Sequence, residues 1–324
     1  MNAKLVTVFG GSGFLGRHVV RALARAHWRI RVAVPHPNMA FFLRPMGSVG
    51  QIAPLKCDVR NAEQVAAAVA GTDAVVNLAG ILVPRGQSFA DVHVAGAANI
   101  ARAAAEAGVA ALVHVSALGA DAGSDSSYAK TKAEGEARVR AAFPAATILR
   151  PSVVFGPEDD FFNRFAALAR VSAVLPLIGG GQTRFQPVFV GDVAAAVAAA
   201  LAQPEAAGKT YELGGPTVYT FRELMQIVCA ETGRKRMLMS LPFGLAGIAA
   251  TFLQFLPKPP LTPDQVRLLR HDNVVSPGAP GLTDLGITPN SVEAEVGSYL
   301  WRYRAKGEYA DLASGGKLRV PATE

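Results

Sequence analysis

Tyr128 and Lys132 have the residue types and the spacing for proton transfer. They lie four residues apart in the stretch SYAKTKAEGEARV, so on a helix their side chains share one face and can meet the same ligand. A free tyrosine loses its proton at about pH 10, and a neighbouring ammonium group favours the phenolate. Tyr128 is therefore a candidate proton donor or acceptor, with Lys132 as its charged neighbour.

A glycine-rich turn near the N-terminus supplies a second candidate site. The segment FGGSGFLG carries Gly10, Gly13 and Gly16 and lies between an apolar run and a helical pattern. Glycines let the backbone bend tightly and approach a pyrophosphate, while the amides and the dipole at the helix start attract the anion. The turn predicts a dinucleotide site that includes Phe14 and Leu15, and a tight turn without a ligand is the alternative.

The residues after the second predicted strand bear on the choice of cofactor. NAD binders usually place an acidic residue about 20 positions after the glycines, where it accepts from the adenosine ribose. No carboxylate occurs between Gly16 and Asp58, whereas His36 and Arg44 could face a 2′-phosphate. We therefore expect NADP(H) to be preferred, with NAD(H) as the alternative. Ordinary solvation of His36 and Arg44 is the competing interpretation.

These candidate residues require a scaffold of alternating strands and helices. Apolar runs predict strands at 4–9, 30–34, 52–57, 74–78, 111–116 and 146–149, with Ala-rich helical patterns between them. Continuous Val, Ile and Leu runs are typical of parallel strands that helices cover on both faces. The sequence thus predicts an α/β fold, a doubly wound parallel Rossmann sheet with a smaller, mainly helical C-terminal lobe.

The rhythm of the pattern also predicts how the chain is divided. We expect a dinucleotide-binding domain over 1–215 with interleaved segments after 150, a smaller lobe over 216–306 and a polar tail over 307–324. After residue 150 the pattern indicates a helix at 161–173, a strand at 187–190 and a helix at 191–202.

The composition excludes several classes of protein. Half of the 324 residues are hydrophobic and 18% are charged, which is typical of a globular chain. Cys57 and Cys229 lie far apart without a CxxC or Cys/His cluster, so we expect reduced thiols, no metal site and a cytoplasmic location. The net charge of +7 favours anionic partners. Spread arginines without interleaved aromatic residues predict no nucleic-acid partner.

Motifs that follow one another along the chain resemble the short-chain dehydrogenase/reductase superfamily, in its extended and atypical branch. Besides the glycine turn, they lie at 58–59, 77–80, 128–132, 150–157 and 187–193. The resemblance implies that Tyr128 and Lys132 are the catalytic pair and also bind the cofactor. It further implies cofactor contacts from Asp58, Val59, Leu78, Ala79, Gly80, Ser116, Pro151 and Val153.

The same resemblance points to a missing catalytic group. In that superfamily a Ser or Thr hydroxyl near the end of the fifth strand polarises the substrate oxygen, and its position falls two residues after Ser116, at Leu118. Loss of one such donor typically costs on the order of a hundredfold in rate. Two interpretations of Tyr128 and Lys132 remain open: a general acid/base pair, or a clamp that retains the cofactor, which we favour.

A narrower likeness follows from the segments 43–47, 155–163 and 285–287. They resemble the nucleotide-binding accessory subunits of respiratory complex I and their bacterial homologues, in which NADPH stays bound and the role is structural. The resemblance implies a non-catalytic accessory or assembly subunit of NADH:quinone oxidoreductase, peripheral at the cytoplasmic face of a bacterial inner membrane. The alternatives are a reductase or epimerase/dehydratase-like enzyme acting on a quinone- or isoprenoid-related substrate, and an NADPH-linked redox sensor.

The stretch 241–256 is apolar almost throughout and follows Arg234, Lys235 and Arg236. It is too short to span a bilayer, and a helix without a polar face must be buried in its own lobe, in a partner or at a membrane boundary. The basic residues suit anionic lipid headgroups. We expect peripheral membrane contact through 241–256, with internal packing of the small lobe as the alternative.

Overall fold

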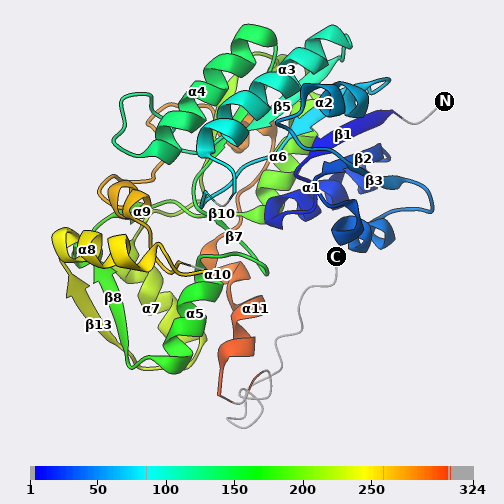
Figure 1. Cartoon of the computed structure of the whole chain (residues 1–324). Coiled ribbons are helices and arrows are strands. Elements are labelled where there is room, and N and C mark those ends of the chain that lie inside the picture. The colour runs from blue at the N-terminus through cyan, green and yellow to red at the C-terminus, as the bar shows by residue number, and fades with distance from the viewer. Residues whose placement is uncertain (1–3, 85, 258, 306, 308–324) are drawn as a thin grey trace. The chain divides into compact units, whose positions relative to one another are not determined.

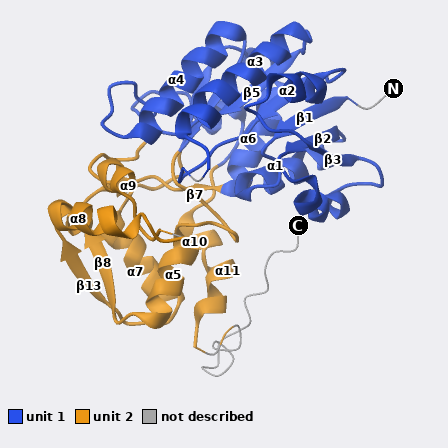
Figure 2. Cartoon of the chain, in the orientation of Figure 1, with its two compact units in different colours: residues 1–151, 190–213, 275–288 blue, residues 152–189, 214–274, 289–324 orange. Residues whose placement is uncertain are grey.

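The computed structural model describes residues 4–84, 86–257, 259–305 and 307. These residues divide into two compact units, and the segments that form each unit alternate along the chain (Figure 2). Unit 1 takes its described residues from 1–151, 190–213 and 275–288, and unit 2 takes its own from 152–189, 214–274 and 289–324. The expected division at residue 215 stays a prediction about folding domains, and the expected tail lies outside the described residues except for Gly307.

A parallel sheet of seven strands forms the centre of unit 1 within the described residues, in the order β11-β6-β5-β4-β1-β2-β3. Figure 1 labels β1, β2, β3 and β5 of this sheet. The strands are β1 (Leu5–Phe9), β2 (Arg29–Val34), β3 (Ile52–Lys56), β4 (Ala74–Asn77), β5 (Ala111–Val115), β6 (Thr147–Pro151) and β11 (Thr210–Leu213). The strand order reverses between β1 and β4, which is the switch point where doubly wound sheets bind ligands. The predicted Rossmann sheet is therefore confirmed, while the seventh strand β11 was not predicted.

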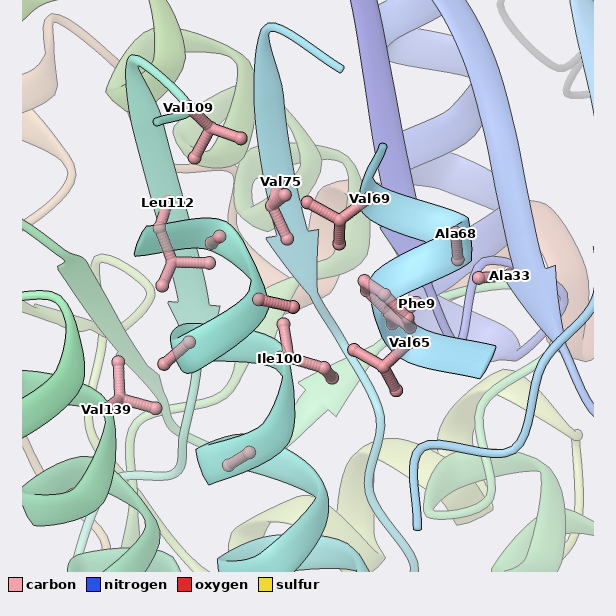
Figure 3. Packing of buried hydrophobic residues seen from close by; sticks show 14 of the residues in the cluster. Phe9, Ala33, Val65, Ala68, Val69, Val75, Ile100, Val109, Leu112 and Val139 are labelled. Carbon is pink, nitrogen blue, oxygen red and sulfur yellow. The ribbon is translucent and has the colours of Figure 1, made fainter. Parts of the chain in front are cut away.

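Helices cover both faces of this sheet (Figure 1). One layer contains α1 (Phe14–Arg25) and α6 (Val190–Ala202), and the other contains α2 (Ala62–Val69), α3 (Ala97–Glu106) and α4 (Ser127–Ala142). Large apolar side chains of β1, β4, β5, α2 and α3 pack together beneath the second layer (Figure 3). Each fully buried side chain of this kind contributes about 1.5–3 kcal/mol to folding, so this core holds the strand ends that carry the site in place.

A π-helical turn, η2 (Ala90–Gly96), precedes α3 and packs tightly against α4. A Cβ atom at Gly135 of α4 would lie 2.1 Å from the carbonyl oxygen of His93, which is far closer than van der Waals contact. Only glycine therefore permits this approach. The contact brings His93 to the helix that carries Tyr128 and Lys132.

Unit 2 is built around aromatic side chains and short strand pairs. Its helices are α5 (Phe162–Val171), α7 (Phe221–Glu231), α8 (Phe243–Leu253), α9 (Pro263–Leu268), α10 (Val292–Glu295) and α11 (Gly297–Leu300). Its strand pairs are β7 (Val154–Phe155) with β10 (Val188–Phe189), β9 (Arg184–Phe185) with β12 (Tyr219–Thr220), and β8 (Val174–Ile178) with β13 (Met237–Leu241). The mainly helical lobe is thus confirmed, and the pairing of β8 with β13 was not predicted.

Two further expectations concern the thiols and the membrane. Cys57 is buried and Cys229 is half-buried, and neither forms a disulfide. Among the described residues, no helix combines the length and hydrophobicity needed to cross a bilayer.

The contact between η2 and α4 predicts a strong effect of one methyl group. We expect Gly135→Ala to lower the free energy of unfolding by about 2 kcal/mol or more, because the new Cβ must displace the backbone at His93. The matched control is Gly247→Ala in α8, where an added Cβ meets no heavy atom within 4 Å. This control should be neutral or stabilise by up to about 1 kcal/mol. Urea unfolding compares the two, and a wild-type stability for Gly135→Ala would contradict the close contact.

Candidate functional site

The glycine turn joins the end of β1 to the start of α1 through contacts that exclude side chains. Gly10 has a φ of 75°, and a Cβ atom there would lie 3.0 Å from the backbone of Leu78. A Cβ atom at Gly16 would lie 2.4 Å from the carbonyl oxygen of Gly10. Gly13 is the N-cap of α1 and has no side chain to bond the first amides of the helix. These amides, which include those of Phe14 and Leu15, suit an anion at the helix start.

The segment after β4 links this turn to the predicted catalytic pair. Leu78 donates its amide proton to the Phe9 carbonyl at 3.0 Å, and the Asn77 side chain accepts from the Ala79 amide at 3.0 Å. An added Cβ at Gly80 would lie 3.3 Å from the Lys132 Nζ. The structure thus brings Leu78, Ala79 and Gly80 between the glycine turn and Lys132.

Tyr128 and Lys132 lie on α4, which begins at the N-cap Ser126. Lys132 is buried, and its Nζ donates to the Val115 carbonyl at 3.4 Å and lies 5.9 Å from the centre of the Tyr128 ring. Burial lowers the pKa of Lys132 to about 8, against the opposing effect of the Glu136 carboxylate. Burial also raises the pKa of Tyr128 to about 12. The predicted shift of Tyr128 toward the phenolate, which in the site also involves the charge of a nicotinamide, stays a prediction, and burial within the chain acts on the pKa in the opposite direction.

His93 is a site residue that the sequence patterns did not reveal. Its Nε2 accepts from the Ile81 amide at 3.1 Å, so the ring proton lies on Nδ1, which is 3.1 Å from the Thr131 hydroxyl oxygen. Burial, with a smaller contribution from the Lys132 charge, lowers the pKa of His93 to about 3. The neutral ring therefore ties the segment after β4 to helix α4. A histidine within an otherwise apolar helical run was the only signal in the sequence.

The same imidazole also fixes the Tyr128 ring. His93 stacks on Phe89 with ring centres 5.4 Å apart and an interplanar angle of 18°. It meets Tyr128 edge to face, at 5.4 Å and 89°. Such aromatic pairs contribute about 0.5–1.5 kcal/mol beyond their burial, so they restrict where the phenol can point.

Two polar groups at the end of β5 are buried without a partner. In the described part of the chain, the Ser116 hydroxyl and the His114 Nε2 make no hydrogen bond. The His114 Nδ1 lies 3.0 Å from the Asn77 side-chain amide, which can only donate to it, so the unpartnered Nε2 carries the proton. An unsatisfied buried group costs about 1–3 kcal/mol. The orphaned Ser116 hydroxyl therefore fits a polar group of a ligand.

Leu118 places an apolar side chain where the family resemblance implies a hydroxyl. Its amide donates to the Pro151 carbonyl at 2.8 Å, and the Ser116 amide donates to the Leu149 carbonyl at 2.8 Å. The segment therefore continues to run beside β6 after β5 has ended. This pairing fixes the backbone of both residues, so Ser116 stays two positions away from the missing hydroxyl.

Asp58 and Val59 follow β3 near the other end of the predicted cofactor site. The Asp58 carboxylate pairs with Arg60 at 2.6 Å, which holds the pKa of Asp58 below its usual range. The cap of α2 is Asn61, whose side chain accepts from the Gln64 amide. Asp58 thus does not cap the helix that follows it. Val59 uses its carbonyl to accept from Asn99 at 3.0 Å.

His36 and Arg44 lie at the two ends of η1 (Pro37–Met46), the segment that follows β2. Arg44 is exposed, and its guanidinium lies 4.1 Å from the centre of the Phe41 ring. Arg17 of α1 lies 5.1 Å from the centre of the neighbouring Phe42 ring. The structure therefore brings a second arginine to this segment. Arg17 was missed, although its place directly after Gly16 was a signal.

Two of the predicted cofactor residues belong to different units. Pro151 ends β6 in unit 1, whereas Val153 belongs to unit 2. The Val153 amide donates to the Asn273 side chain at 3.1 Å, and its carbonyl accepts from the Val188 amide at 3.0 Å. The geometry of unit 1 therefore assembles the predicted site from the glycine turn to Lys132 without Val153.

The residues of unit 1 fit a nicotinamide dinucleotide. A Cβ atom at Gly10 would collide with the Leu78 backbone, so the turn stays tight, and the first amides of α1, which no N-cap side chain bonds, suit an anion. The Ser116 hydroxyl is an unused donor and acceptor. A ligand that accepts hydrogen bonds from the first amides of α1 and from the Ser116 hydroxyl would satisfy these groups.

Comparison with known proteins supports this assignment of fold. The model of the NAD dependent epimerase/dehydratase family matches residues 6–214. A dTDP-glucose 4,6-dehydratase from Streptomyces venezuelae, solved with NAD and TYD bound, superposes with a TM-score of 0.72 at 22% identity and covers 97% of this chain and 99% of its own. This likeness shows the shared fold.

Curated relatives match over most of the chain. The mitochondrial NADH dehydrogenase [ubiquinone] 1 alpha subcomplex subunit 9 of Arabidopsis thaliana is 37% identical over 94% of this chain and 79% of its own length. The NADH-ubiquinone oxidoreductase 40 kDa subunit of Neurospora crassa is 34% identical over 100% of this chain and 84% of its own. A ceramide reductase of Caulobacter vibrioides is 34% identical over 74% of each.

The buried ammonium of Lys132 makes stability depend on pH. Burial lowers its pKa from 10.5 to about 8, so between these values the unfolded chain binds more protons and the free energy of unfolding rises with pH. We expect the ligand-free wild type to gain about 2 kcal/mol relative to Lys132→Met between pH 8 and pH 10.

Urea unfolding across this range measures the difference, with Lys130→Met as the matched control because it removes an exposed lysine from the same helix. A difference between wild type and Lys132→Met that stays constant with pH would contradict the burial of a charged amine.

Proposed function

Because the chain belongs to the NAD dependent epimerase/dehydratase family, we propose that it holds NADP(H) and serves as an accessory or assembly subunit of an NADH:quinone oxidoreductase, with little or no turnover. The observation that carries the proposal is an intact nucleotide cradle beside a reaction centre in which Leu118 replaces the expected hydroxyl. The Arabidopsis and Neurospora relatives, named as subunits of such an oxidoreductase, support the partner.

In this proposal the backbone of unit 1 binds the cofactor. Gly10, Gly13 and Gly16, with the amides at the start of α1, hold the pyrophosphate. The segment 78–80 lines the centre of the site, and Asp58 and Val59 line its adenosine end. At the nicotinamide end, the Ser116 hydroxyl and the Lys132 ammonium bond the ribose and its neighbours.

The side chains at the nicotinamide end suit a clamp better than a catalyst. When bound, the cofactor supplies hydride chemistry. Tyr128 is protonated at neutral pH, and burial moves its pKa further up, to about 12, so it can donate one hydrogen bond. Leu118 gives a substrate oxygen no second donor, and one such donor is worth on the order of a hundredfold in rate. Lys132 and His93 instead hold the segment after β4 and the phenol in place.

The preference for NADP(H) rests on two arginines. Arg17 and Arg44 lie over neighbouring rings of η1, and β2 leads into that segment without a carboxylate. A 2′-phosphate between these guanidinium groups would form charge-assisted hydrogen bonds, which are the stronger kind. NAD(H) lacks this phosphate, so Arg17 and Arg44 would keep only their contacts with the phenylalanine rings of η1.

The location follows from the partner in this proposal. An accessory subunit of a bacterial oxidoreductase would lie in the cytoplasm, at the cytoplasmic face of the inner membrane.

A reductase acting on a hydrophobic substrate is the second candidate function. The retained Tyr128 and Lys132 favour it, as does the relative named as a ceramide reductase. The missing donor at Leu118 weighs against it.

Cofactor selectivity is testable by charge removal. We expect Arg44→Gln and Arg17→Gln each to weaken NADPH binding about tenfold, because each removes a charge-assisted hydrogen bond of about 1.5 kcal/mol or more, and to leave NADH binding unchanged. The matched control is Arg21→Gln, which removes an exposed arginine one turn further along α1. Calorimetric titration with both nucleotides measures this, and equal affinities of the wild type for NADPH and NADH would contradict the proposal.

Replacement of Tyr128 distinguishes the two candidate functions, an accessory subunit and an enzyme. We expect Tyr128→Phe to keep bound nucleotide and to copurify with the assembled oxidoreductase like wild type, because a clamp loses only one hydrogen bond. Lys132→Met should lose both the bound nucleotide and the association with the oxidoreductase. With 9,10-phenanthrenequinone as a probe, NADPH oxidation should be negligible in wild type and should rise on the order of a hundredfold in Leu118→Ser, which restores the donor. Steady wild-type turnover that Tyr128→Phe abolishes would instead establish the reductase.

A further inference from the structure

Helix α8 in unit 2 buries small apolar residues and exposes large ones, which is the reverse of what is expected for a helix in water. Ala246 and Ala250 are fully buried, whereas Leu245, Ile248 and Phe252 are 58%, 61% and 73% exposed. An amphipathic helix normally buries its large apolar side chains and exposes small or polar ones. The buried core beneath α8 is formed by its two alanines with Ile178 and Val266, and the half-buried Phe243 packs against it. Leu245, Ile248 and Phe252 do not belong to this core.

The exposed side chains form one continuous apolar face. Leu245, Ile248 and Phe252 are three and four residues apart and therefore lie on one side of α8. Phe255 and Leu256, directly after the helix, add side chains that are 82% and 49% exposed. We call these five residues the α8 face. Monomeric proteins rarely expose such a contiguous apolar patch without a binding role. Internal packing, which was the alternative for residues 241–256, therefore does not account for these side chains.

Polar groups on α8 are already used within the helix. The Thr251 hydroxyl donates to the Gly247 carbonyl at 2.9 Å, and the Gln254 side chain donates to the Thr251 carbonyl at 2.9 Å. A protein interface typically carries about one hydrogen bond per 100–200 Å². The α8 face offers no such group of its own, which suits contact with hydrocarbon rather than with a protein surface.

Positive charge predominates in the part of the chain that carries this face, where the carboxylate of Asp264 lies 3.7 Å from Arg267. Between residues 232 and 271 the sequence has Asp264 as its single acidic residue, against six lysines and arginines. Arg270 lies 5.6 Å from the centre of the Phe243 ring at the start of α8, and Arg267 lies on α9, which packs against α8. Lys235 is exposed just before β13. Cations beside an apolar protrusion complement a surface of anionic headgroups.

We propose that the α8 face binds the interface of a bilayer that contains anionic lipids. Leu245, Ile248 and Phe252 enter the acyl boundary, while Arg267 and Arg270 contact headgroups. The helix lies on the membrane rather than through it. This surface belongs to unit 2, whereas the cofactor residues argued above belong to unit 1, and the proposal does not rest on cofactor binding or on a complex I partner.

Vesicle sedimentation of the full chain tests the proposal. We expect the wild type to bind vesicles of phosphatidylcholine with about one third phosphatidylglycerol more tightly than vesicles of phosphatidylcholine alone, by about fivefold for each cation that contacts a headgroup. Ile248→Ser/Phe252→Ser should weaken binding about a hundredfold, since each large side chain contributes about tenfold. Arg267→Gln/Arg270→Gln should remove the preference for the anionic vesicles.

Val49→Ser is the matched control, because it removes a fully exposed aliphatic side chain from unit 1. It should bind vesicles like wild type, and every variant should show a cooperative unfolding transition in urea as evidence of folding. Recovery of the wild type in the supernatant with both vesicle types would overturn the proposal. Wild-type binding by Ile248→Ser/Phe252→Ser would also overturn it. The proposal would also be overturned if the wild type were a dimer and Ile248→Ser/Phe252→Ser were a monomer, because a second copy of the chain would then cover the α8 face.

Brominated lipids provide a second measurement. Phe252→Trp should show quenching of its added fluorescence by lipids brominated along the acyl chain, relative to a wild type that has only Trp28 and Trp301. Unquenched emission from vesicle-bound Phe252→Trp would place another surface at the membrane and would overturn the proposal. If the wild type binds vesicles but does not associate with the oxidoreductase, that result would count against the proposed function alone.

Discussion

The approach of one backbone to another at Gly10 is the constraint on which unit 1 depends. The end of β1 lies so close to the end of β4 that a single Cβ at Gly10 would meet the Leu78 backbone at 3.0 Å. Because the strand order reverses between these two strands, the turn and the segment after β4 lie together at the switch point of the sheet. The turn also aims the amides of α1 toward this point. The suitability of this end of the sheet for an anion thus follows from backbone geometry before any side chain contributes.

A second close approach positions the side chains. Gly135 lets η2 meet α4, and His93 then reaches the Ile81 amide, Thr131 and Tyr128 together. This arrangement buries Lys132 and leaves Tyr128 half-buried, and desolvation moves the pKa of the first down to about 8 and that of the second up to about 12. At neutral pH Tyr128 is therefore neutral, whereas Lys132 mostly keeps its charge. The His93 ring and the Val115 carbonyl hold the two side chains in place.

The sequence predicted what depends on local pattern. Apolar runs located six strands of the sheet, and glycine spacing located the turn, because both follow from backbone sterics and from burial on two faces. His93 and the β8 and β13 pair were missed because their partners are set by tertiary contacts between distant residues. Strand β11 was missed because its short segment, TYEL, alternates in burial rather than forming an apolar run. The desolvation of Tyr128 was not predicted, because spacing reveals a neighbouring ammonium group but not burial, which acts on the pKa in the opposite direction.

The unsatisfied groups explain why a site without the usual hydroxyl at Leu118 would be kept. Ser116 and His114 each bury a polar atom without a partner in the described part of the chain, and such atoms cost about 1–3 kcal/mol apiece. A bound dinucleotide that satisfied Ser116 would offset part of this cost. Binding to the folded state alone adds about 2.7 kcal/mol when the ligand is at a hundred times its dissociation constant. Against a net stability of about 5–15 kcal/mol, that contribution is large. A cofactor that never reacts can therefore be a structural element of such a fold, and residues that bound it would have a physical role whether or not any hydride is transferred.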